Sequence, residues 1–156
     1  ELRNQLNKQK DASRKIPEGC KELHKTAEKV LRSLAKHKNP PSPIRSALGT
    51  IRDIKSALAN ICPDLRRYGS KMRNWIGKIY NNCLRCLGAG KCNGRSSNSK
   101  RSHFKKCKSR VDTLGDVSKD FSRYQKRLIR QHRRWQKATK KLQSAIKTAN
   151  KKARKR

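Results

Sequence analysis

The sequence predicts an all-α protein, a disulfide-stapled helical bundle of four to five helices that includes a long basic C-terminal helix. Apolar residues recur at three- and four-residue spacing along most of the 156 residues, which is the period of an amphipathic helix. No stretch of useful length alternates apolar and polar residues as a half-buried strand would. Only 32% of the residues are hydrophobic, so six cysteines are expected to reinforce a small core.

The first part of the chain predicts an N-terminal arm followed by one helix. Residues 1–15 are highly charged and are expected to form a flexible or helical arm that ends before Pro17. Proline is tolerated in the first turn of a helix, so Pro17 predicts the start of the next helix, which continues at helical spacing to Leu34. Three prolines in residues 39–43 predict a break, with Ser42 as the cap of the following helix.

The middle of the chain predicts two more helices, separated at Pro63. Proline disrupts a helix interior, and Asp64 directly after it is suited to cap the second of these helices. The glycines that begin at Gly88 predict its end. Residues 88–102 are rich in Gly, Ser, Asn and Lys, which indicates an exposed loop.

The last part of the chain contains no proline and predicts an unusually long helix. Its apolar residues fit a near-heptad repeat, which indicates one very long helix or two helices joined near Gly115. Polar residues such as His132 and Thr139 interrupt the stripe, so we expect the C-terminal half to project from the bundle as a partly exposed basic rod. Residues 150–156 form a basic tail, and residues 1–156 make one helical domain.

The cysteines are even in number and favour three disulfides. Disulfides persist in oxidising compartments, so this count indicates a secreted, extracellular protein. A chain that begins at Glu1 without an initiator Met is also what removal of a signal peptide would leave. Six cysteines allow many connectivities; the pairing of Cys86 with Cys92 is the geometrically easy one. The expected disulfide residues are Cys20, Cys62, Cys83, Cys86, Cys92 and Cys107.

The same cysteines allow a zinc or a redox interpretation. A CxxC pair at Cys83 and Cys86 followed by Cys92, His103 and Cys107 could supply four zinc ligands. Such a site would favour an intracellular protein that binds nucleic acid. The CxxC pair alone could also be a redox motif, although it lies at a helix end rather than in a βαβ unit. Three disulfides use all six cysteines, so we expect no metal and no cofactor.

The strongest functional signal is the excess of positive charge. The chain has 44 Lys and Arg against 10 Asp and Glu, for a net charge of +34. Between Lys100 and Arg156 there are 22 basic residues and only three acids. Small soluble domains need a net charge of only about 2 to 8 for solubility, so the excess predicts a polyanionic partner.

The basic residues that we expect to bind a polyanion all follow the predicted loop. Residues 104–109 have the alternation of basic and non-basic residues that resembles the heparin-binding cluster, and residues 150–155 nearly repeat it. The expected binding residues are Lys105, Lys106, Lys108, Arg110, Arg123, Lys126, Arg127, Arg130, Arg133, Arg134, Lys137, Lys140, Lys141, Lys151, Lys152, Arg154, Lys155 and Arg156.

These patterns predict a secreted, non-enzymatic, monomeric protein that binds a polyanion by charge neutralisation. The expected partner is a sulfated glycosaminoglycan such as heparin or heparan sulfate, polyphosphate or another anionic surface, and competition for it would inhibit a surface-triggered cascade. Catalysis is not expected, because the four histidines have no neighbouring carboxylate in the sequence to orient them.

Three other functions stay open at this point. They are a membrane-active or antimicrobial helical protein, a helical cytokine or gamete-recognition protein, and the intracellular zinc-containing binder of nucleic acid. Contact with an anionic membrane surface would use the same basic faces. Any binding of nucleic acid would be non-specific, because the chain has few aromatic residues to stack on bases.

Overall fold

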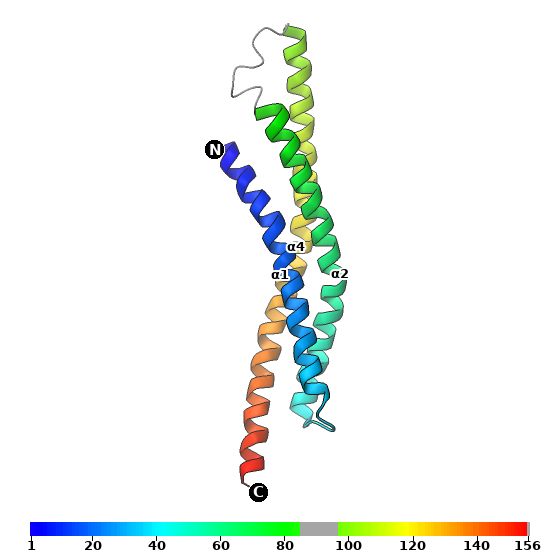
Figure 1. Ribbon diagram of the computed structural model, residues 1–156, viewed down its shortest axis with the longest axis vertical. Helices are drawn as coiled ribbons and strands as arrows, with labels where there is room; N and C mark the ends of the chain where they lie inside the picture. The colour runs from blue at the N-terminus through cyan, green and yellow to red at the C-terminus, as the bar shows by residue number, and fades with distance from the viewer. Residues whose placement is uncertain (85–96, 156) are drawn as a thin grey trace. The chain divides into compact units, whose positions relative to one another are not determined.

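The computed structural model describes the backbone of residues 1–84 and 97–155 and the side chains of residues 1–83 and 101–155. These residues form three α-helices, α1 (Leu2–Ala35), α2 (Ser42–Ile79) and α4 (Ser97–Arg154), and a single π-helical segment, η1 (Tyr80–Leu84), which follows α2 directly (Figure 1). No strand occurs in the described residues. The all-α prediction is confirmed, whereas the expected number of four to five helices is wrong.

The helix count differs because two prolines lie inside helices. Pro17 falls within α1 and Pro63 within α2, so neither marks a boundary. An interior proline removes one backbone hydrogen bond and typically costs about 3 kcal/mol. The predicted N-terminal arm, residues 1–15, is consequently the first part of α1 and takes the helical alternative.

The predicted break in residues 39–43 is confirmed. α1 ends at Ala35, and Asn39 has a φ of 54°, a left-handed conformation in which asparagine is one of the favoured residues. The first hydrogen bond of α2 runs from the amide of Arg45 to the carbonyl of Pro41 (3.0 Å). The capping residue is therefore Pro41, one position before the expected Ser42.

The long C-terminal helix is present and continuous through Gly115. α4 has 58 residues, which corresponds to a length of about 87 Å. It begins at Ser97, so the last six residues of the predicted loop 88–102 are helical instead. Residues 88–96 lie outside the described part of the chain.

The chain divides into two compact units, each built from parts of all three helices. Unit 1 comprises Glu1–Pro17 and Asp64–Tyr124, and unit 2 comprises Glu18–Pro63 and Gln125–Arg156. Each unit has its own apolar core. The core of unit 1 contains Leu6, Leu65, Met72, Ile76, Ile79, Leu114 and Phe121. The core of unit 2 contains Ala27, Ile44, Leu48, Ile51, Ile54, Leu58, Ile61, Ala138 and Leu142.

The C-terminal half of α4 is partly exposed as expected, but its residues up to Leu142 pack within unit 2 instead of projecting from the bundle. Ala138 and Leu142 are buried, and so is the polar Gln131. The buried side of the helix includes positions 131 and 138. These lie one residue before the polar positions 132 and 139 at which the sequence suggested that the apolar stripe was interrupted. Gln131 is accommodated because its Oε1 accepts a hydrogen bond from Arg134 (3.0 Å).

A polar contact in unit 1 compensates for the proline inside α1. In a regular helix the carbonyl of Ser13 would accept from the amide of residue 17, and Pro17 has no such N–H. Ser13 is fully buried, and its carbonyl instead accepts a hydrogen bond from Nη1 of Arg73 on α2 (2.9 Å). Gly69 allows this close approach, because a Cβ there would lie 2.5 Å from the same oxygen.

Candidate polyanion-binding site

Two disulfides join helical segments, one within each unit. Cys20 on α1 is bonded to Cys62 on α2 within unit 2, and Cys83 in η1 is bonded to Cys107 on α4 within unit 1. These four cysteines are therefore confirmed as disulfide residues. Cys86 and Cys92, with the pairing suggested for them, lie outside the described residues.

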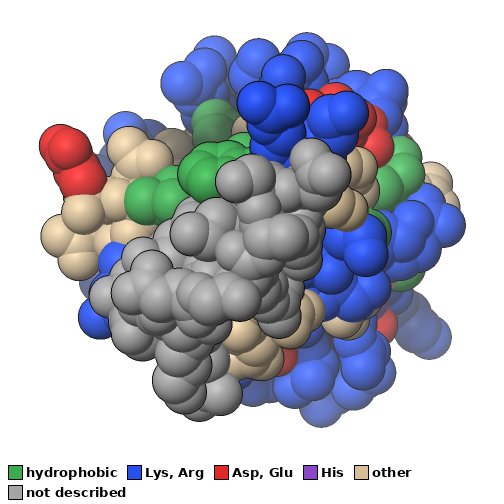
Figure 2. Space-filling model, turned by 90° about the horizontal axis from the view of Figure 1, so that it is seen from above, with side chains coloured by type: hydrophobic (Ala, Val, Ile, Leu, Met, Phe, Trp, Pro, Cys, Tyr) green, Lys and Arg blue, Asp and Glu red, His purple; other side chains and the backbone are tan. Residues whose placement is uncertain are grey.

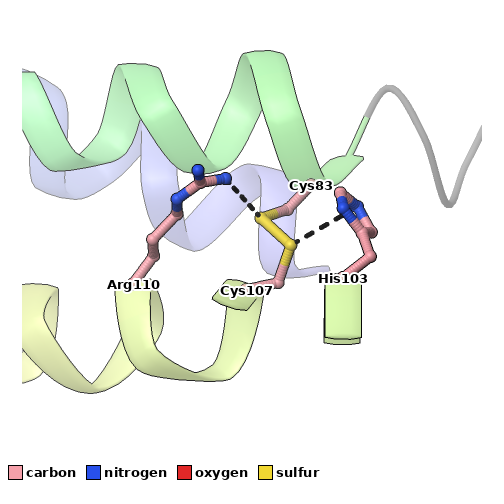
Figure 3. Close-up of a disulfide and its surroundings, with 4 residues drawn as sticks. All are labelled: Cys83, His103, Cys107 and Arg110. Carbon is pink, nitrogen blue, oxygen red and sulfur yellow. Dashed lines mark hydrogen bonds between the residues drawn. A yellow bond between two sulfur atoms is a disulfide. The ribbon is translucent and has the colours of Figure 1, made fainter. Parts of the chain in front are cut away.

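The second disulfide removes the basis of the zinc interpretation. Zinc binds deprotonated cysteine, and the sulfurs of Cys83 and Cys107 are instead joined to each other. His103 Nε2 lies 3.6 Å from Sγ of Cys107, so the expected histidine ligand contacts the disulfide (Figure 3). Cys83 also does not pair with Cys86 as a CxxC redox motif would. No cluster suited to a metal occurs among the residues that the structure describes.

Arg110 is directed at this disulfide rather than at solvent. Its side chain is half-buried, and Nη1 donates to Sγ of Cys83 (3.8 Å), from the side opposite His103 (Figure 3). Arg110, which the sequence placed among the expected polyanion-binding residues, is therefore less available to an anion. Lys105, Lys106 and Lys108 on the same helix are exposed.

Arg123, another expected binding residue of unit 1, is paired. Arg123 forms an ion pair with Asp120 (2.6 Å) and lies over the ring of Tyr124 (5.8 Å to the centroid). Both partners hold the guanidinium, so Arg123 is less available to an anion than its position in the sequence suggests. Figure 2 shows the described side chains at one end of the molecule, where Lys and Arg far outnumber Asp and Glu.

The part of α4 in unit 2 carries an unbroken excess of positive charge. From Gln125 to Arg156 there are fourteen Lys and Arg and no Asp or Glu. Ten of them recur at three- and four-residue spacing and so share one helical face, here called the basic face. The basic face consists of Lys126, Arg130, Arg133, Arg134, Lys137, Lys140, Lys141, Lys151, Lys152 and Lys155.

The basic face points largely to solvent. All of its residues are exposed except Arg134, which is half-buried because it also binds Gln131. Arg127 and Arg154, also predicted to bind a polyanion, are exposed on α4 outside this face. Arg156 lies outside the described residues. The structure thus gathers most of the predicted residues of unit 2 into one surface.

A groove runs beside the basic face, between α4 and the beginning of α2. Its volume is about 730 Å³, and both helices that form it belong to unit 2. Its basic lining residues all come from α4: Arg134, Lys137, Lys140, Lys141 and Lys152. The remaining lining residues are short or are prolines: Pro41, Pro43, Ser46, Ala47, Thr50, Ala138, Ser144, Ala145, Thr148 and Ala149.

A second, smaller hollow lies along α4 alone. It has a volume of about 490 Å³ and is lined by Lys126, Ile129, Arg130, Arg133, Arg134 and Lys137. The two hollows share Arg134 and Lys137. Positively charged side chains of α4 therefore line both hollows.

The sequence did not reveal the contribution of α2 to this site. The α2 wall consists of Ser, Thr, Ala and Pro, none of which has a charge that would signal anion binding. The alternation of small residues on α4, at 138, 145 and 149, was the one available signal. It is weak, because alanine at such spacing is also common in ordinary helix packing.

The fold and this surface define a disulfide-bonded, all-helical protein with an acid-free basic helix face. No protein-family model, no curated protein and no solved structure matches the chain. None of the described helices contains an apolar run sufficient to cross a bilayer.

Proposed function

We propose that the chain is a secreted, non-enzymatic protein that binds linear polyanions, with sulfated glycosaminoglycans as the main class. The observation that carries the proposal is the basic face of α4, a row of ten Lys and Arg on a helical segment without a single acid. An ordinary solvated helix face mixes charges of both signs, which limits its attraction for anions. A face of one sign maintains that attraction along its whole length.

The mechanism is the release of counter-ions. A linear polyanion condenses cations along its length, and each Lys or Arg that contacts a sulfate or phosphate group displaces them. The favourable entropy of this release makes the affinity fall steeply as salt rises. Arginine adds bidentate hydrogen bonds to anionic oxygens, and the basic face includes the exposed Arg130 and Arg133 for such contacts.

The two disulfides support the extracellular part of the proposal. Structural disulfides persist in oxidising compartments and are uncommon in the cytosol. Cys20–Cys62 and Cys83–Cys107 each join two helical segments, so both have a structural place in the fold. Sulfated glycosaminoglycans are extracellular polymers, so the compartment and the proposed ligand agree.

Heparin affinity chromatography in a salt gradient tests the proposal. We expect elution far above roughly 0.15 M salt and a linear decrease of log affinity with log salt. Desulfated heparin is the control, because it keeps the polymer and loses most of the charge. Elution near physiological salt, or equal retention on the desulfated matrix, would contradict the proposal.

One observation favours a second candidate, adsorption to anionic membranes. Phe104 and Val111 are 60% and 44% exposed and lie seven residues apart on α4 in unit 1, among the exposed Lys105, Lys106 and Lys108. Apolar side chains beside lysines are typical of helices that lie in a lipid interface. Leakage from phosphatidylglycerol vesicles that Phe104→Ser abolishes would support this function.

A further inference from the structure

We propose that the groove between α4 and the beginning of α2 in unit 2 is the specific binding site of the polysaccharide. This inference rests on the proposed function. The basic face alone would attract any polyanion from one side. The groove adds a second wall, so a bound chain would be contacted by two helices at once. Shape as well as charge then selects the ligand.

The charges of the groove match a linear anionic chain. Its lining residues on α4 extend from Arg134 to Lys152, a distance of about 27 Å along the helix axis. Five of these are basic, and no acid lines the groove. A short anion would reach only part of this row, whereas a sulfated oligosaccharide can place successive sulfate groups along it.

The depth of the groove depends on short side chains. Ala145 and Ala149 on α4 are half-buried and each present a single methyl group, whereas Ala47 and Ala138 are buried beneath the groove. Longer side chains at these positions would fill the space between the helices. A polysaccharide can therefore approach the helix backbones while the long lysine side chains of α4 fold over it from one edge.

The α2 wall supplies polar and electrostatic contacts. Ser46 and Thr50 lie one turn apart on the lining face and offer hydroxyl oxygens to a sugar. Pro41 caps α2 and Pro43 lies in its first turn, so the positive dipole end of α2, which favours a nearby anion, lies beside the groove. Charge complementarity thus applies to both walls, although only α4 carries formal charges.

Two sets of variants separate this site from general electrostatic attraction. Lys137→Gln, Lys141→Gln and Lys152→Gln together remove three charges from the groove. Lys105→Gln, Lys106→Gln and Lys108→Gln remove three exposed charges from unit 1 and serve as the matched control. We expect the groove set to reduce the slope of log affinity against log salt by about two to three and to weaken heparin binding at least tenfold more than the control.

A neutral variant tests the shape of the groove without changing its charge. Ser144 is exposed and lines the groove, so Ser144→Phe would obstruct it without disturbing the core. The neighbouring Gln143 is exposed and does not line the groove, so Gln143→Phe is its control. We expect Ser144→Phe to weaken binding of a heparin octasaccharide several-fold and Gln143→Phe to leave it unchanged. Circular dichroism checks that every variant folds.

The outcomes distinguish the groove from the proposed function. Equal losses in both lysine sets together with no effect of Ser144→Phe would overturn the groove and leave polyanion binding intact. Failure of the unmodified chain to bind heparin would overturn both. An effect of Ser144→Phe on binding of a synthetic acidic amphipathic helix, but not of heparin, would overturn the polysaccharide as the occupant of the groove.

Discussion

Replacing Arg73 should expose the dependence of α1 on a side chain of α2. Arg73 donates to the carbonyl of Ser13 (2.9 Å) and approaches the Ser13 hydroxyl (3.4 Å). That carbonyl is orphaned within its own helix because residue 17 is proline. Arg73→Ala leaves it buried without its charged donor, since Ser13 is fully buried. The expected loss of stability is about 1.5 to 3 kcal/mol, the range for hydrogen bonds to charged groups.

A double-mutant cycle with Pro17→Ala isolates this interaction. Alanine at position 17 provides the amide that a regular helix would use, so the Ser13 carbonyl regains a partner on α1. Arg73→Ala should then cost less in the Pro17→Ala background, with a coupling energy of about 1 kcal/mol or more. Arg73→Met is a useful control, because it keeps most of the aliphatic packing and removes only the donor.

Urea unfolding followed by tryptophan fluorescence can measure the effect in unit 1 alone. The chain has two tryptophans, Trp75 in unit 1 and Trp135 in unit 2. In a Trp135→Phe background the signal of Trp75 therefore reports the unit that contains Arg73. If Arg73→Ala costs the same stability with and without the Pro17→Ala substitution, the reasoning is refuted, because the arginine would then not be substituting for the missing amide.

Further predictions concern packing and the disulfides. Gly69→Ala should destabilise unit 1 by about 1 to 3 kcal/mol, despite the better helix propensity of alanine, because the added Cβ would meet the Ser13 carbonyl. A Cβ at Gly115 meets nothing within 4 Å, so Gly115→Ala should stabilise α4 by about 0.5 to 1 kcal/mol. The urea concentrations at the midpoint of unfolding measure both effects. Replacing Cys20 and Cys62 by serine opens a link between residues 42 apart and should cost about 4 kcal/mol, so an unchanged melting temperature would be inconsistent with a structural role. Complete reduction should raise the intact mass by about six daltons if all six cysteines are paired, and by about four if only the two described disulfides exist.

Periodicity and prolines predicted the helical class, the break after α1 and the presence of a long C-terminal helix. These features are local: apolar spacing defines a helix face, and the three prolines of residues 39–43 come together with the left-handed Asn39. The same reasoning wrongly predicted helix boundaries at Pro17 and Pro63, which lie inside α1 and α2. Pro17 is accommodated by Arg73, which lies far along the chain, and no local pattern can report such a partner.

The basic face was predictable, whereas the groove was not. Charge is visible in the sequence, and most of the expected residues of unit 2 do lie together on α4. The packing register was misjudged because Gln131 and Ala138 are buried, whereas the expected stripe ran through His132 and Thr139. The register decides which side of α4 meets α2, and therefore where a groove can form. Disulfide pairing was equally inaccessible, because it depends on which helices become neighbours.

The covalent structure of unit 2 has a consequence for how ligand and fold depend on each other. Cys20–Cys62 joins α1 to α2, and no cysteine follows Cys107, so the segment of α4 from Gln125 onward is held in the unit by non-covalent contacts. Repulsion among its fourteen cations opposes this docking. A bound polyanion removes that repulsion, and a ligand at a hundred times its dissociation constant stabilises the bound form by about 2.7 kcal/mol. The protein should therefore resist unfolding and proteolysis better on its target surface than free in solution.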